Sequence, residues 1–209
     1  MSTQKLRFVG PFARLAWPAV LLLAAFGRAP AAAAPKLVTD PLQFESEPDW
    51  HLTQGQVASL ATTSVHTQGQ AALAIAAPQN YVRIDSKAID STNPELAPLE
   101  VGSQVSLDFQ IPVAQANPYW FGNVQMFISA PSRNVYGAYL GDAELTGRPT
   151  GVFTTLQFAI PAAVATALEG ATYSDLTVGI ALTVPGGTTG VYIIDNFRLT
   201  EPKLPSPSN

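Results

Sequence analysis

Few side chains in this sequence of 209 residues have the chemistry of a catalytic centre. There is no cysteine, so a thiol nucleophile, a disulfide framework and a Cys-based metal site are all excluded. The only two histidines, His51 and His66, are well separated in the chain and have no acidic cluster beside them, which is not a metal signature. No Gly-x-Ser-x-Gly motif offers a nucleophile elbow. These features favour a protein without catalytic activity.

Carboxylates are the remaining candidates for acid–base chemistry. A glycosidase needs two of them facing each other across a cleft, roughly 5–9.5 Å apart. Asp108, Asp142 and Glu144 could supply such a pair. Asp142 and Glu144 belong to the Gly-rich segment Gly141–Gly147, which we interpret as a loop where solvated acidic side chains are normal. Nothing in the sequence singles out one pair, so a small secreted glycoside hydrolase or lyase is kept as an alternative.

A cluster of aromatic residues points to recognition by stacking. Tyr119 and Trp120 follow Asn117-Pro118, a dipeptide that signals a turn, and precede an apparent strand. Tyr and Trp offer a large contact area at low entropic cost and keep a polar handle, so they suit the apolar face of a sugar ring. The candidate carbohydrate-binding residues are Tyr119, Trp120, Gln125, Arg133, Tyr136 and Tyr139. The alternative is that the aromatic residues are core, with Phe127 and Tyr136 facing inward.

Alternation of apolar and polar residues predicts the strands that would position these side chains. It is clearest at 105–111, 155–160 and 176–184, where one face of each strand would meet a core and the other the solvent. Weaker strand signals cover 42–45, 56–65, 71–76, 81–85, 124–129, 135–140 and 191–199. Pro161–Glu169, which opens with proline and stops at a glycine, predicts one short connecting helix. The pattern as a whole predicts an all-β, antiparallel β-sandwich.

Both ends of the chain are expected to lie outside this domain. Residues 1–34 combine a basic start, the apolar run Leu15–Phe26 and an A-x-A exit, which is the pattern of a cleaved signal peptide. A transmembrane anchor would need about 20 apolar residues, and Pro18 interrupts this shorter run. We therefore predict a single domain at 35–200, secreted or located in the periplasm or at the cell surface. Residues 201–209 are rich in proline and serine and predict a disordered tail.

The net charge of the chain limits the kinds of partner that we expect. Without residues 1–34 the chain keeps seven Lys and Arg against 15 Asp and Glu, so its net charge becomes −8 in place of −4. An acidic surface repels phosphate backbones, so we do not expect a nucleic-acid partner. We expect a monomer without a transmembrane anchor.

Three segments occur in a fixed order: Phe44-Glu45 followed by Trp50, then His66–Ile75, and finally Tyr192–Leu199. In this order the chain resembles the galactose-binding-like carbohydrate-binding modules of secreted bacterial proteins, and the resemblance covers most of residues 42–200. It implies a jelly-roll β-sandwich that accompanies polysaccharide degradation without catalysing it.

The resemblance also implies a structural calcium ion held by Glu45, Asp195 and backbone carbonyls. Calcium takes about six to eight oxygen ligands and commonly mixes carboxylates with carbonyls. Asp195 lies within an apolar strand, where an unpaired carboxylate is costly to bury. Two alternatives need no metal: Asp195 could pair with Arg198 or Arg83, or it could cap a turn.

The sequence and the resemblance together predict a secreted, non-catalytic module that recognises a polysaccharide or cell-surface glycan by aromatic stacking. An extracellular surface or matrix module that contacts protein is the first alternative, and the small hydrolase or lyase is the second. A continuous exposed apolar patch would favour a protein partner, whereas two inward-pointing carboxylates in one cleft would favour an enzyme.

Overall fold

Ten β-strands form two five-stranded sheets in the computed structural model, which describes residues 41–97 and 99–200. The strands are β1 (Trp50–Gln56), β2 (Ser59–Thr63), β3 (Ala72–Ala76), β4 (Gln79–Ser86), β5 (Gln104–Gln110), β6 (Asn123–Ala130), β7 (Val135–Glu144), β8 (Phe153–Ala159), β9 (Thr177–Thr183) and β10 (Val191–Thr200). The 3-10 helices are η1 (Pro41–Gln43), η2 (Glu47–Asp49), η3 (Pro94–Leu96) and η4 (Pro131–Arg133), and the α-helix is α1 (Ala162–Leu168). The chain divides into two units, residues 1–34 and 35–209, and every described residue belongs to the second.

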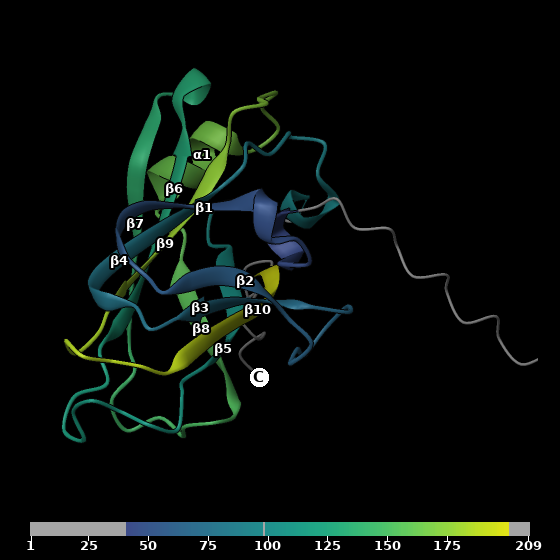
Figure 1. Ribbon diagram of the computed structural model, residues 1–209. Helices are drawn as coiled ribbons and strands as arrows, with labels where there is room; N and C mark the ends of the chain where they lie inside the picture. The colour runs from purple at the N-terminus through teal and green to yellow at the C-terminus, as the bar shows by residue number, and fades with distance from the viewer. Residues whose placement is uncertain (1–40, 98, 201–209) are drawn as a thin grey trace, which may run out of the picture. The chain divides into compact units, whose positions relative to one another are not determined.

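The two sheets are called sheet A and sheet B below. Sheet A has the strand order β1-β4-β9-β6-β7 and sheet B the order β2-β3-β10-β5-β8 (Figure 1). All their strand pairs are antiparallel. The predicted all-β antiparallel sandwich with one short connecting helix is therefore confirmed, and α1 forms between Pro161 and Glu169 as expected.

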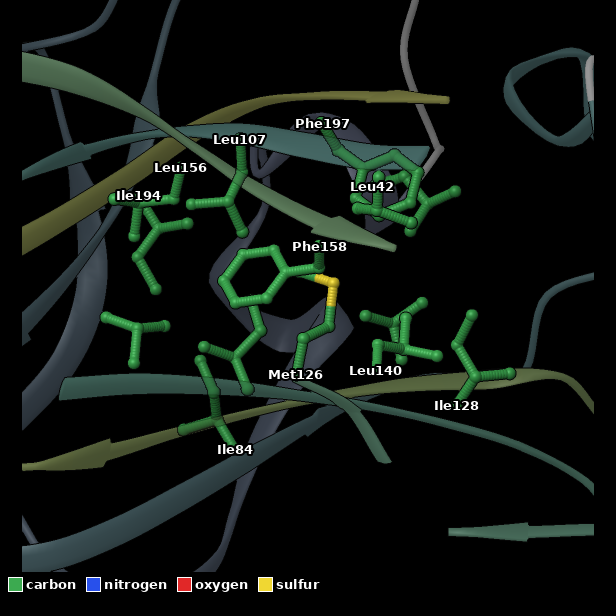
Figure 2. Close-up of a cluster of buried hydrophobic side chains, with 14 of the residues drawn as sticks. Leu42, Ile84, Leu107, Met126, Ile128, Leu140, Leu156, Phe158, Ile194 and Phe197 are labelled. Atoms are coloured by element: carbon green, nitrogen blue, oxygen red, sulfur yellow. The ribbon is translucent and has the colours of Figure 1, made fainter. Parts of the chain in front are cut away.

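The hydrophobic core lies between the sheets because alternate residues of each strand point to opposite faces. Ile84 and Met126 point inward from sheet A toward Leu107 and Phe158 of sheet B (Figure 2). The outward positions of the same strands are free to carry polar and aromatic side chains. Figure 2 also shows Leu42, from the segment before β1, within this core.

Two predicted strands are wrong. Residues 42–45 do not form a strand: η1 ends at Gln43, and Phe44 adopts a left-handed φ of 60° and stacks on Trp50 with 5.0 Å between ring centroids. Residues 56–65 are not one strand, because β1 ends at Gln56 in sheet A and β2 begins at Ser59 in sheet B. Alternation along the chain does not reveal that the chain changes sheet at this point.

The predicted loop at Gly141–Gly147 is wrong as well. Asp142 and Glu144 belong to β7, which runs further than its apolar positions suggested. The predicted signal peptide at 1–34 and the tail at 201–209 lie outside the described residues. Within the described part of the chain, no helix has the length and apolar character needed to cross a membrane.

Candidate functional site

The outer face of sheet A, the face turned away from the core, carries the main group of polar and aromatic side chains. β4 places Arg83 and Asp85 on this face, since Val82 and Ile84, which alternate with them, are buried in the core. β9, the central strand, contributes only small residues to the outer face, Gly179 among them. A long side chain from β4 can therefore cross β9 and reach β6.

Arg83 makes this crossing. Its Cζ atom lies 4.6 Å from the centre of the Phe127 ring on β6, in a cation–π contact. Asp85 fixes the guanidinium by accepting hydrogen bonds at Oδ1 from Arg83 Nε (3.0 Å) and Nη2 (2.8 Å). Thr53 of β1 donates its hydroxyl to the other oxygen, Asp85 Oδ2, at 2.7 Å. Side chains of β1, β4 and β6 are thus joined by direct contacts that pass over β9.

Tyr139 of β7 extends this group to the edge of the sheet. Its ring lies 5.5 Å from that of Phe127, tilted by 46°, because the two residues are partners in the β6–β7 register. The Tyr139 hydroxyl donates a 2.6 Å hydrogen bond to Asp142 Oδ1. This bond, together with burial and the Asp142 charge, raises the pKa of Tyr139 to about 12. Tyr139 therefore stays protonated at any physiological pH and holds its ring in one orientation.

The structure places the six predicted carbohydrate-binding residues along β6 and β7 and not at one point. Gln125 and Tyr139 lie on the outer face of sheet A. Tyr119 and Trp120 lie in the loop that leads into β6, whereas Arg133 and Tyr136 lie beyond its other end. Since eight residues of strand extend roughly 25 Å, one sugar ring cannot contact both end groups.

The alternative that these aromatic side chains, Phe127 and Tyr136 among them, face the core is wrong. Tyr136 is 69% exposed and Tyr139 46% exposed, and Phe127 is half-buried on the outer face. Tyr119 is 88% exposed and Trp120 37%. Arg133 is engaged elsewhere, because its Nε donates to the Ala167 carbonyl oxygen of α1 at 3.1 Å.

Sequence reasoning missed Arg83, Asp85 and Gly179 as part of this group. The alternation of β4 does place Arg83 and Asp85 on one face, and that signal was available. Their proximity to Phe127 depends on the strand order β4-β9-β6, which alternation does not contain.

A second group of carboxylates lies on the opposite side of the sandwich, under the loop at 64–71 that joins β2 to β3. Glu45 accepts hydrogen bonds from the backbone N–H groups of Gln70 (2.9 Å) and Ala71 (2.9 Å). Asp195 accepts at Oδ2 from the N–H groups of Thr67 and Gln68, the latter at 2.8 Å. The two carboxylates bind successive N–H groups of this loop, which we call the clamped loop.

Asp108 of β5 completes the attachment of the clamped loop. The Thr67 hydroxyl lies 2.9 Å from Asp108 Oδ2 and 2.9 Å from Asp195 Oδ2, so it donates to one of them at a time. Burial by itself raises the pKa of Asp108. Side-chain hydrogen bonds, from Asn196 and Thr155 among others, and the Arg198 guanidinium outweigh burial, so this pKa lies below its usual value of 3.8. Asp108 is therefore ionised at neutral pH.

A β-bulge explains how these acidic side chains come together. Asp195 is paired with Asp108 and Arg198 with Ser106, so β10 has one extra residue between the two pairs. Asn196 lies at this bulge and has a left-handed φ of 56°. As a result, Asp195 and Arg198 both face outward, and Arg198 pairs with Asp108 at 3.2 Å. Asp195 forms no ion pair with Arg198 or Arg83, and it caps the clamped loop, as the alternative of a turn cap predicted.

Comparison with known proteins identifies the fold. The sequence matches no protein-family model, and no curated protein matches it. A solved carbohydrate-binding module of the β-sandwich superfamily matches with a TM-score of 0.50 and 13% identity over 76% of this chain and 60% of that chain. CBM27-1 of Caldicellulosiruptor saccharolyticus, solved with mannohexaose, matches with a TM-score of 0.49 and 13% identity over 78% of this chain and 96% of that chain. The likeness to the first of these structures shows that this chain has a β-sandwich fold.

A third solved structure is a CBM28 module specific for non-crystalline cellulose, with a TM-score of 0.49 and 15% identity over 78% of this chain and 94% of that chain. The β-sandwich fold agrees with the one implied by the resemblance that Phe44-Glu45, His66–Ile75 and Tyr192–Leu199 carry. The chain spans only about 60% of the length of the first matched structure.

The donors around Glu45 and Asp195 do not fit the calcium ion that the resemblance implies for such a module. A cation binds oxygen atoms, whereas the groups aimed at these carboxylates are N–H and O–H donors. Asn196 Oδ1 is a buried oxygen without a hydrogen-bond partner among the described residues, but one amide oxygen falls far short of the about six to eight that calcium takes. No group of three or more His, Cys, Asp or Glu within residues 41–97 and 99–200 could hold a metal ion. The calcium site itself stays a prediction.

The carboxylates considered for catalysis are separated by the β-sandwich fold. Asp108 lies on the outer face of sheet B, beneath the clamped loop, whereas Asp142 and Glu144 lie on β7 of sheet A. Asp142 and Glu144 are two residues apart on one strand, so they stand side by side and do not face each other across a cleft. Neither arrangement resembles the opposed pair that a glycosidase uses.

Proposed function

We propose that this protein is an exported, non-catalytic module that binds a polysaccharide or cell-surface glycan on the outer face of sheet A. The observation that carries the proposal is the grouping of exposed rings. Every exposed large aromatic side chain among the described residues belongs either to β7 or to the loop that leads into β6. These side chains are Tyr119, Trp120, Tyr136 and Tyr139. Exposed rings confined to β7 and this loop, and spread along the strands, mark an elongated contact surface.

The chemistry of this surface suits sugar rings. Tyr139 offers a flat ring that is kept in place by its bond to Asp142, so little side-chain entropy is lost when a sugar stacks on it. Gln125 lies beside Asp142 in the β6–β7 register, and its amide can both donate to and accept from hydroxyl groups. Tyr119 and Trp120 lie further along and would contact a different unit of the same glycan chain.

Calorimetric titration of the purified protein with a panel of mannan, xylan, β-glucan and galactan tests the proposal. We expect binding to at least one of them. Replacing Tyr139 by alanine should weaken that binding by about tenfold, the size of one lost stacking contact. Val101→Ala is the control, because Val101 is exposed in the turn before β5 of sheet B.

Absence of binding to every glycan in the panel, by protein that unfolds cooperatively, would contradict the proposal. In that case the exposed rings would be interpreted as a contact surface for a protein partner. A Tyr139→Ala variant that binds as tightly as the unchanged protein, while Trp120→Ala does not, would move the site to the loop before β6.

Export completes the proposal and rests on residues 1–34, whose basic start and apolar run are those of a signal peptide. The structural calcium ion is implied by the family resemblance alone and is not part of this proposal, because Glu45 and Asp195 would have to exchange N–H donors for the ion.

A further inference from the structure

We propose that Arg83 is a binding residue on the outer face of sheet A and selects uncharged sugars there. The proposal rests on the proposed function and assigns to the centre of the sheet a contact that the exposed rings of β7 and the β6 loop do not provide. Arg83 and Tyr139 lie on either side of one ring, that of Phe127, at 4.6 Å and 5.5 Å from its centre. Together they present a planar cation next to an aromatic ring.

The guanidinium is fixed before any ligand arrives. Asp85 holds two of its nitrogens, Phe127 supports its plane, and Thr53 fixes Asp85 in turn. A long arginine side chain normally loses considerable rotamer entropy when it binds a ligand. Here much of that entropy is already lost on folding, so a contact with ligand costs less.

Glycine at position 179 makes this arrangement possible. A Cβ atom on Gly179 would collide with Asp85 Oδ1 and lie 2.7 Å from Arg83 Nη2. The backbone of Gly179 needs no left-handed conformation, because it is not among the positive-φ glycines. The requirement for glycine is therefore spatial, and it comes from the side-chain pair that lies over it.

The charges around Arg83 favour hydroxyl groups over carboxylates. Arg83 is paired with Asp85, so its charge is already neutralised, and Asp142 adds a negative charge to the same face. An acidic sugar would have to compete with Asp85 for the guanidinium and approach Asp142 as well. Within the described residues, Arg83 Nη1 makes no hydrogen bond and the side chain keeps 25% of its surface exposed, so it can donate to a sugar hydroxyl.

The test measures how tightly the unmodified protein and four variants bind uncharged mannan, xylan, β-glucan and galactan, and acidic polygalacturonate and alginate. Arg83→Met removes the cation, Arg83→Lys keeps charge but loses the planar fork, and Gly179→Ala displaces the pair without altering either partner. Lys87→Met is the matched control, because Lys87 forms an ion pair with Asp49 at 3.0 Å outside the Arg83 group. Thermal unfolding of each variant establishes that it is folded.

We expect unmodified protein to bind an uncharged glycan, and both Arg83 variants and Gly179→Ala to weaken this binding about tenfold or more. Lys87→Met should bind as the unmodified protein does. If the protein binds a glycan and folded Arg83→Met binds equally well, the inference is overturned while the proposed function stands. Preferential binding to the acidic polymers also overturns it. Failure of the unmodified protein to bind any of the six polymers overturns both.

Discussion

The two outer faces of this sandwich use carboxylates in opposite ways. On sheet B, Asp108 and Asp195 are buried, and Asp195 is bound chiefly by backbone N–H groups of the clamped loop. On sheet A, Asp85 and Asp142 bind the side chains of Arg83 and Tyr139, which remain accessible to solvent. The same residue type attaches a loop on one face and orients a contact surface on the other.

This difference predicts which face tolerates substitutions without loss of the fold. A buried carboxylate that satisfies several N–H groups leaves all of them unpaired when it is removed, and each unpaired group costs about 1–3 kcal/mol. A carboxylate that orients an accessible side chain leaves, when it is removed, a group that water can reach. We therefore expect changes on sheet B to lower stability and changes on sheet A to lower ligand binding.

The largest expected effect is that of Asp195→Ala. This change leaves the N–H groups of Thr67, Gln68 and Asn196 without their acceptor, and should lower the free energy of unfolding by about 3 kcal/mol or more. Urea unfolding measures it. The control is Asp175→Ala, because Asp175 also accepts from a backbone N–H, that of Ser132, but in an exposed loop. If both variants lost the same free energy of unfolding, the expected difference between the two faces would be contradicted.

A smaller effect is expected for Gly69→Ala. Gly69 has a φ of +70°, and a Cβ atom there would collide with Glu45 Oε1, so the Glu45 carboxylate must leave the N–H groups of Gln70 and Ala71. Gly137→Ala is the matched control, since Gly137 has a φ of +56° with nothing within 4 Å of an added Cβ. Gly69→Ala should lower unfolding free energy by about 1–2 kcal/mol more than Gly137→Ala.

A double variant isolates the cause of that difference. When Glu45→Ala is already present, Gly69→Ala meets no carboxylate, so its extra cost should vanish in a double-mutant cycle. An unchanged extra cost would mean that backbone strain at Gly69, and not the contact with Glu45, is responsible.

The smallest expected effect on stability is that of removing or adding calcium. Thermal unfolding in EDTA and after addition of calcium should give the same midpoint, because the carboxylates of sheet B are already occupied by N–H donors. A bound ion would instead raise the midpoint with calcium concentration. A rise that disappears in Glu45→Ala and Asp195→Ala would support the calcium site that the family resemblance implies, and would make the clamped loop a metal-dependent element.

Several features of the site could be predicted from local sequence. The turn signal at Asn117-Pro118 marked Tyr119 and Trp120 as candidate stacking residues, and both rings are exposed. The apolar surroundings of Asp195 correctly required a partner for its carboxylate. The partner itself, a loop more than a hundred residues earlier, could not be found in this way.

The sequence by itself determined the fold class, because alternation of apolar and polar residues sets which face of each strand meets the core. It also excluded thiol chemistry, because the chain has no cysteine. Only the tertiary structure decided that β1 and β2 belong to different sheets and that Arg83 crosses Gly179 to reach Phe127. The physical reason is that alternation reports the direction of a side chain, whereas its neighbours follow from strand pairing between distant parts of the chain.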